Sequence, residues 1–185
     1  MFDVASTRRT FERTAAAVRE SLEHPQRVTH LGVGRGKVHE VASTRRVMGP
    51  DGKVRHVRYS SCKDPEVRAE PEGTIDPFVQ LVSLWDGDRP IASLTYYATH
   101  PQSYYGKGGV SADFVGMARS LREATLPNVT HIHFNGAGGN VTAGKYNDGS
   151  PETRPLLARR LADGMSGAWD ATTKSPIRCS DVRWE

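Results

Sequence analysis

Apolar residues recur at intervals of three and four in three segments of the chain, which is the spacing of one face of an α-helix. Each segment starts near a Ser or Thr that can cap a helix. The first helix has no strand before it, so the chain reads as if it begins within a larger α/β pattern. The predicted helices run from a cap at Ser6 or Thr7 to just before Pro25, from a cap at Ser111 over Ala112–Ala124, and from a cap at Ser150 or Thr153 over Arg154–Thr172. Their apolar faces carry Phe11, Ala15, Val18 and Leu22; Phe114, Ala118 and Leu121; and Leu157, Leu161, Met165 and Ala168.

Segments rich in β-branched and aromatic residues predict strands between these helices. The turn sequence Gly49–Gly52 and the link Asp86–Pro90 are each expected to close a hairpin. Residues 60–77 carry three prolines and little periodicity, which predicts a loop. Hairpins mixed with helices indicate an α/β protein, a mixed β-sheet with flanking helices in one domain over residues 1–185. The predicted strands are Val28–Val33, Val38–Val47, Val54–Tyr59, Phe78–Trp85, Ile91–Ala98 and Val129–Phe134.

The composition excludes several classes of protein. With 37% hydrophobic and 25% charged residues the chain is ordinary for a soluble domain, and no stretch approaches the roughly 18 apolar residues of a membrane-spanning helix. The net charge is +4, and scattered arginine pairs without interleaved aromatics do not favour nucleic-acid binding. Cys62 and Cys179 lie too far apart for a metal knuckle. The N-terminus shows no signal peptide, and the sequence leaves the compartment and the oligomeric state open.

A histidine stands just beyond the predicted strand Ile91–Ala98. Pro101 forces the chain to turn after His100, so the imidazole can point into a cleft. A histidine in this place can equally be structural, because the sequence shows no partner for it. The stretch Ser111–Asp113 can hold a hydrogen-bond network near His100 or simply cap the following helix, and the cap is the preferred interpretation.

The glycine-rich stretch Asn135–Thr142 directly follows a predicted strand. Glycines at this density let backbone N–H groups approach a ligand and can build an oxyanion hole, or they can form a bare loop. Residues 139–145 also nearly match a phosphate-binding loop. Tyr146, however, stands where Ser or Thr is required, and turn sequence follows in place of a helix. A nucleotide-binding function is therefore disfavoured.

Two further histidines lie on the predicted strand Val129–Phe134. His131 and His133 are two residues apart and share a face, so they could share a metal ion. The preferred interpretation instead places them on the face of the sheet away from the core, where they alternate with Ile132 and Phe134.

Six short motifs occur in a fixed order over about residues 28–145. They are Val41–Arg46, Gly73–Pro77, Arg89–Ala92, Ala98–Pro101, Ser111–Asp113 and Asn135–Val141. This series resembles the central part of the neutral/alkaline ceramidases, zinc-dependent amidases that cleave the N-acyl bond of ceramide. The resemblance implies a partial catalytic domain, zinc as cofactor and a lipid amide as substrate. It also implies a secreted or periplasmic location.

The resemblance also implies roles for individual residues. His100 matches a zinc ligand, and Thr142 stands where the family has a nucleophilic serine. Arg45 or Arg46 matches an arginine near the active site, and Asn140 replaces an aspartate. The residues expected to form the oxyanion loop are Gly136, Gly138 and Gly139.

The resemblance supplies only one metal ligand, whereas a catalytic zinc needs about three protein ligands. The family's other ligands are a histidine before the matched region, and a glutamate and a tyrosine after it. Two functions therefore stay open. One is a truncated zinc-dependent amide hydrolase of the neutral ceramidase type, whose metal site is incomplete in this chain. The other is a catalytically silent binding module, or pseudoenzyme fragment, with the same fold.

Overall fold

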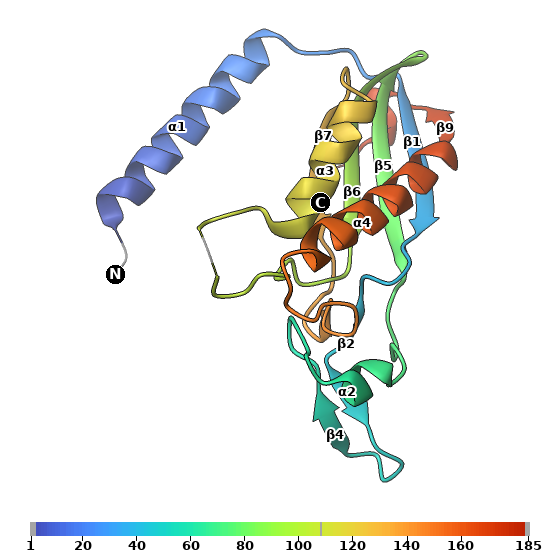
Figure 1. The fold of residues 1–185 in the computed structure, drawn as a ribbon. Helices are drawn as coiled ribbons and strands as arrows, with labels where there is room; N and C mark the ends of the chain where they lie inside the picture. The colour runs from blue at the N-terminus through green and yellow to red at the C-terminus, as the bar shows by residue number, and fades with distance from the viewer. Residues whose placement is uncertain (1–2, 108, 184–185) are drawn as a thin grey trace.

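A five-stranded sheet forms the centre of the computed structural model, which describes residues 3–107 and 109–183 (Figure 1). Its strands β6 and β7 run parallel, and the other neighbours are antiparallel. The mixed sheet with hairpins and flanking helices predicted from the sequence is therefore confirmed. The order across the sheet is β7 (Thr130–Asn135), β6 (Arg89–Tyr97), β5 (Phe78–Asp86), β1 (His30–Lys37) and β9 (Thr173–Pro176).

Two helices, α3 (Asp113–Thr125) and α4 (Thr153–Asp170), pack on one face of this sheet and on each other (Figure 1). The predicted inward positions of α4 are all buried, as are Phe114 and Ala118 of α3. Leu121, also predicted to face inward, is 44% exposed. Arg122 is buried instead and donates to the Ser166 hydroxyl of α4 at 3.0 Å.

The opposite face of the sheet carries a row of apolar side chains, and among the described residues no helix covers it. The strand register places Val33 opposite Val82, Val82 opposite Leu94, and Leu94 opposite Ile132. Paired residues point to the same side of a sheet, so these four side chains form one row across four strands. The two ends of the row are open to solvent, with Val33 55% and Ile132 40% exposed.

The histidines of β7 lie on the other side, beneath α3. His131 is buried and His133 half-buried, whereas Ile132 and Phe134 are exposed. The prediction that the histidines face away from the core is wrong, because the apolar residues of β7, Ile132 and Phe134, lie on the open face of the sheet. Burial lowers the pKa of both imidazoles, that of His133 to about 4. Both rings are therefore neutral near pH 7.

Small elements extend the fold beyond one end of the sheet (Figure 1). The predicted strand Val38–Val47 is interrupted, since only two short pieces of it pair, each with a different partner. The stretch predicted as a loop contains a helix that Asp64 caps and Pro65 opens, a typical N-terminal pair. These elements are β2 (Ser43–Thr44) paired with β8 (Val141–Thr142), β3 (Arg46–Met48) paired with β4 (Val54–Val57), α2 (Pro65–Ala69), and a 3-10 turn (Cys179–Asp181) after β9.

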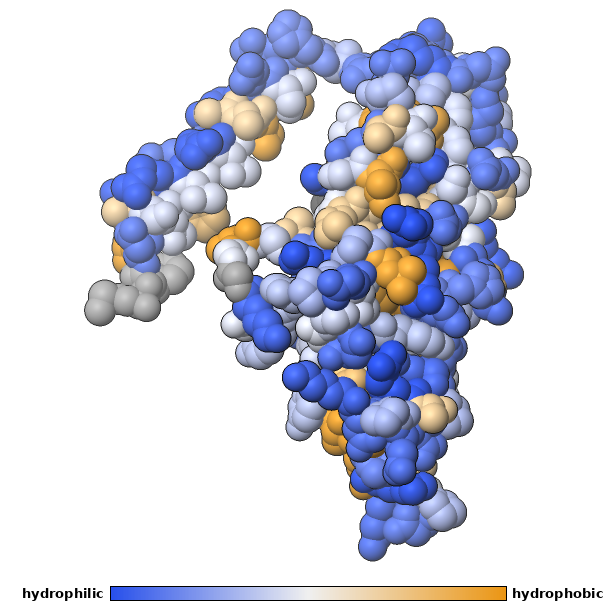
Figure 2. Space-filling model, in the orientation of Figure 1, coloured by the Kyte–Doolittle hydropathy of each residue, from blue (hydrophilic) through white to orange (hydrophobic). Residues whose placement is uncertain are grey.

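The predicted first helix is present as α1 (Val4–Glu23) and stands apart from the body (Figures 1 and 2). Its cap is Asp3, whose carboxylate accepts from the backbone N–H of Ser6, so the prediction of a cap at Ser6 or Thr7 is wrong. None of its residues is buried, and Phe11 is 70% exposed. Among the described residues, no helix combines the length and apolar character needed to cross a membrane.

Candidate functional site

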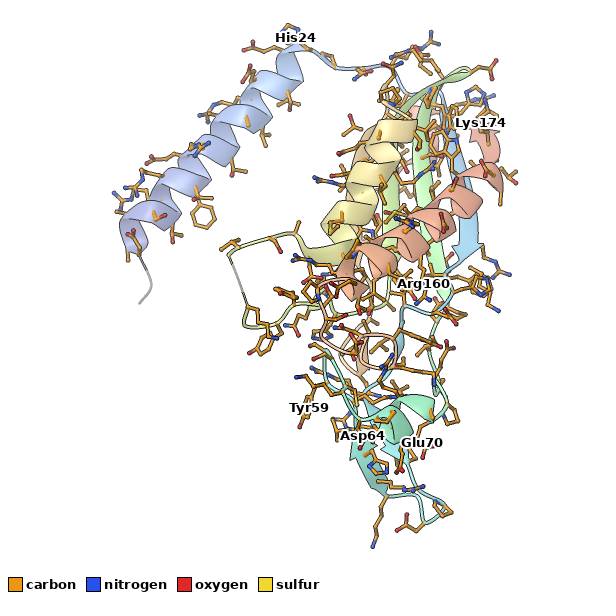
Figure 3. All side chains as sticks on the ribbon, in the orientation of Figure 1. His24, Tyr59, Asp64, Glu70, Arg160 and Lys174 are labelled. Carbon is orange, nitrogen blue, oxygen red and sulfur yellow. The ribbon has the colours of Figure 1, made fainter. Side chains whose placement is uncertain are left out.

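A cavity of about 490 Å³ opens beyond the end of β6. Three separate segments build its wall: the junction of β2 and β3, the residues that follow β4, and the residues that follow β6. Figure 3 shows Tyr59, one of the lining residues, at this end of the molecule, near the start of α2. The cavity thus brings together two residues that the sequence singled out, Arg45 and His100. The lining residues are Arg45, Tyr59, Ser60, Ser61, His100, Gln102 and Tyr105.

The glycine loop holds His100 in a defined orientation. The His100 backbone N–H donates to the Val141 carbonyl at 3.0 Å, and the ring Nδ1 lies 2.7 Å from the Gly138 carbonyl oxygen. A carbonyl oxygen only accepts, so Nδ1 carries the proton and Nε2 keeps its lone pair. Histidines that bind metals commonly donate their other ring N–H to a carbonyl in this way. The ring is therefore prepared to act as a ligand or a base through Nε2.

A buried asparagine joins the two sides of the cavity. The Asn147 side-chain amide donates to the Ser60 carbonyl at 2.7 Å and to the Ser103 carbonyl at 2.8 Å. Ser103 is in turn fixed by Asp113, whose carboxylate accepts from its backbone N–H at 3.0 Å and from its hydroxyl. Sequence analysis missed Asn147, because its position in a turn sequence gives no sign of burial.

The start of α3 contributes to this network through Asp113, and Ser111 does not occupy the N-cap position. Ala112 occupies the N-cap position, and the Ser111 hydroxyl accepts from the Asp113 N–H at 3.2 Å. The preferred prediction of a capping serine is therefore wrong. The alternative, a hydrogen-bond network close to His100, is what the structure contains.

Beneath the cavity, the guanidinium of Arg58 is fully buried among carbonyl groups. It donates to the Pro71 carbonyl at 2.7 Å, to the Glu70 carbonyl at 2.9 Å and to the Thr44 carbonyl at 3.2 Å. Burial lowers the pKa of Arg58. The Arg58 backbone N–H donates to the Arg45 carbonyl at 2.7 Å. Arg58 therefore fixes the junction of β2 and β3, from which Arg45 reaches the cavity.

The two adjacent arginines have different surroundings. Arg46 is exposed and donates to Asn140 Oδ1 at 2.9 Å, beside a neighbouring hollow of about 470 Å³. Arg45 lines the His100 cavity, and its buried Nε has no hydrogen-bond partner among the described residues. The resemblance left the choice between the two arginines open, and the structure brings Arg45 to His100. Asn140 lies with Arg46, outside that cavity.

The glycine loop uses much of its backbone internally. The N–H of Gly136 donates to the Tyr97 carbonyl, and that of Gly138 donates to the Gly136 carbonyl. These two N–H groups are thus occupied. At Gly139 a Cβ would meet nothing within 4 Å, so there is open space beside this residue. The oxyanion role of the loop stays a prediction, and its visible role is to hold His100.

Thr142 lies behind the wall of the cavity. Its fully buried hydroxyl donates to the Tyr59 carbonyl at 2.8 Å and accepts from the Gly144 N–H at 3.2 Å. The structure therefore does not bring the Thr142 hydroxyl into the cavity that His100 lines. The role of Thr142 as nucleophile stays a prediction, and it requires the contact with Tyr59 to open.

Lys145, the lysine in the near match to a phosphate-binding loop, has a structural role. Lys145 Nζ donates to the carbonyls of Arg68 and Glu70, each at 2.6 Å, at the C-terminal end of α2. The next helix begins only at Thr153, so no helix N-terminus faces this lysine. The nucleotide-binding interpretation is therefore excluded for residues 139–145.

In residues 3–107 and 109–183, no three His, Cys, Asp or Glu side chains lie close enough together to hold a metal ion. His100 thus fits a metal as one ligand, and the described part of the chain does not complete the set of about three.

Comparison with known proteins shows similarity in fold. No protein-family model and no protein of known function matches the sequence. Solved structures do match, among them a ceramidase complexed with C2 (TM-score 0.54, 12% identity) and the neutral ceramidase from Pseudomonas aeruginosa (TM-score 0.54, 14% identity). Each match covers 77% of this chain and 22% of the ceramidase, so the chain spans about a fifth of their length. The chain has a ceramidase-like fold.

Proposed function

We propose that this chain is part of an amide hydrolase of the neutral ceramidase type. The observation that carries the proposal is a ceramidase-like fold in which His100 and Arg45 line one cavity beside the glycine loop. Fold alone does not fix chemistry, so the proposal depends on this pair of residues as well. The substrate class is an amide, and a lipid amide is the substrate that analogy with ceramidases suggests.

His100 lines the cavity, and because its Nδ1–H is bound to the Gly138 carbonyl, Nε2 is the ring nitrogen left for a ligand. A zinc ion bound there would polarise the amide carbonyl and lower the pKa of a bound water. Arg45 places positive charge in the same cavity, where it favours negative charge that develops on the substrate oxygen. His100 is one ligand, and on this proposal the remaining ligands come from residues outside those described.

A second candidate function is a silent module that binds an amide without cleaving it. Two observations favour it: the Thr142 hydroxyl is occupied by the Tyr59 carbonyl, and the described residues hold no set of three metal ligands. The cavity itself would be the same in both cases.

Zinc titration distinguishes these functions. The chain has seven histidines, whose ring resonances can be followed individually by NMR. Of these, we expect His100 to respond at the lowest zinc concentration and through Nε2, because its ring is already oriented in the ligating tautomer. His100→Ala should abolish this first response, and His39→Ala, a change at an exposed histidine outside the cavity, should preserve it.

An equal response of the exposed histidines, with no preference for His100, would favour the silent module. So would a response at the same low zinc concentration that survives in His100→Ala, because the metal would then bind elsewhere.

A further inference from the structure

The side chains that line the His100 cavity can all form hydrogen bonds. Among the described residues, each that lines it is Arg, Tyr, Ser, His or Gln, and none is aliphatic or acidic. A long acyl chain binds by burying apolar surface, which this wall offers mainly on the rings of Tyr59 and Tyr105, both largely exposed to solvent. Apolar lining occurs elsewhere, in a groove of about 630 Å³ between α3 and α4 that includes Met117, Leu121 and Pro155. The His100 cavity therefore fits a small polar group better than an aliphatic chain.

Within this cavity, Arg45 is a cation without an acidic partner among the described residues. Its Nε is buried and makes no hydrogen bond to the described part of the protein. Burying a charged donor without a partner is costly, so such groups commonly mark the place of a ligand. Neighbouring Arg46, by contrast, is bound to Asn140 and faces solvent.

The other polar groups add donors on the same wall. The Ser60 hydroxyl donates to Gln102 Oε1 at 3.0 Å, which leaves the Gln102 amide N–H groups for a ligand. Ser61 and Tyr105 contribute hydroxyls. A cation and several donors without a carboxylate suit a ligand rich in acceptors. The fork of an arginine matches the two oxygens of a carboxylate.

We propose that the substrate of this site is an N-acyl amino acid, with its amide at His100 and its carboxylate bound by Arg45. The inference rests on the proposed hydrolase function, which places the amide at His100. An amide and an α-carboxylate lie only a few bonds apart, and both side chains line the same cavity of about 490 Å³. A neutral amide of an amino alcohol would leave the Arg45 guanidinium without a partner.

The test compares two small amides of similar size that differ in their terminal group. N-acetylglycine carries the carboxylate, and N-acetylethanolamine carries a neutral hydroxyl in its place. Measured by NMR titration of the full chain without metal, N-acetylglycine should bind about 10- to 100-fold more tightly, the range of a charge-assisted hydrogen bond. Arg45→Gln should remove this preference. Arg46→Gln, which removes the same charge from the adjacent exposed residue, should retain it, and the same spectra report whether each variant is folded.

Three results would overturn the inference: equal binding of both amides, the same loss in Arg46→Gln as in Arg45→Gln, or binding of acetate as tight as that of N-acetylglycine. The last would identify a simple anion site. These outcomes are separate from the proposed function, since binding is measured without metal or turnover. A chain that prefers N-acetylglycine but shows no zinc response at His100 contradicts only the hydrolase, and the reverse contradicts only this inference.

Discussion

Gly34→Ala is expected to lower the free energy of unfolding by about 3 kcal/mol or more, at the upper end of the cost of overpacking. Gly34 lies on the face of β1 that α4 covers, and a Cβ there would stand 2.1 Å from the backbone oxygen of Ala168. Helix and strand are both held by their own hydrogen bonds, so neither can move away without repacking the core. The midpoint of urea unfolding measures the loss.

Two matched variants separate this clash from a general effect of losing a glycine. At Gly32, on the same face of β1, the nearest atoms belong to the Ser83 and Thr172 side chains, which can rotate, so Gly32→Ala should cost less. At Gly109 a Cβ meets nothing within 4 Å, and its replacement should leave the midpoint unchanged. The packing described here would be refuted by a Gly34→Ala midpoint equal to that of Gly109→Ala.

Arg58→Met should destabilise the part of the fold that carries the cavity. Methionine fills a similar volume but donates no hydrogen bond, so the carbonyls of Thr44 and Pro71 lose their buried donor, while the Glu70 carbonyl keeps Lys145. Each unsatisfied buried acceptor costs about 1–3 kcal/mol, and we expect a total loss of about 3 kcal/mol. Urea unfolding measures the loss, and faster proteolysis within residues 60–77 should accompany it.

Arg55→Met is the matched control. Arg55 is exposed, and its contact with Glu70 is a single one at 3.5 Å, so its removal should change stability by less than about 1 kcal/mol. If Arg58→Met were as stable as Arg55→Met, Arg58 would not hold this part of the fold together.

The sequence predicts those elements whose signals are local. Apolar runs around the link Asp86–Pro90 predict the hairpin of β5 and β6, and helical periodicity predicts α1, α3 and α4. Turn residues between Val47 and Val54 likewise predict the pairing of β3 and β4. These elements form from neighbouring residues, so a short window of sequence contains the necessary information.

Pairings over long distances lack such a signal. The two residues of β2 pair with β8 about a hundred positions later, and β9 has the polar sequence Thr173–Pro176. The actual limits of β1 also escaped prediction, because its covered face consists of Gly32, Gly34 and Gly36. Their small size allows α4 to approach β1 closely. A pattern of hydrophobic residues does not reveal such glycine positions.

The exposed apolar face of the sheet explains the error at β7. Sequence reasoning assigns apolar side chains to the core, yet both faces of this sheet carry them: Val79, Leu81 and Tyr97 lie under the helices, and Leu94 and Ile132 lie on the open face. On β7 the apolar residues take the open face, so His131 and His133 face the helices.

The sequence predicts part of the candidate site. Its motifs indicate His100 and an adjacent pair of arginines, and in the structure Arg45 is the one that lines the His100 cavity. The sequence does not predict the roles of Arg58 and Asn147, because their side chains donate hydrogen bonds to backbone carbonyls of segments distant in the sequence. Burial of the Thr142 hydroxyl depends on the Tyr59 carbonyl, a contact that the glycine loop alone does not indicate.

The tautomer of His100 provides the most direct test of the central claim, that Nδ1 donates to the Gly138 carbonyl and leaves Nε2 as the free ring nitrogen. Long-range ¹H–¹⁵N NMR of the metal-free chain at neutral pH assigns the tautomer. The account predicts a proton on Nδ1, held by the Gly138 carbonyl, and none on Nε2. A neutral ring protonated on Nε2 would contradict it, because Nε2 could then neither bind a metal nor accept a proton.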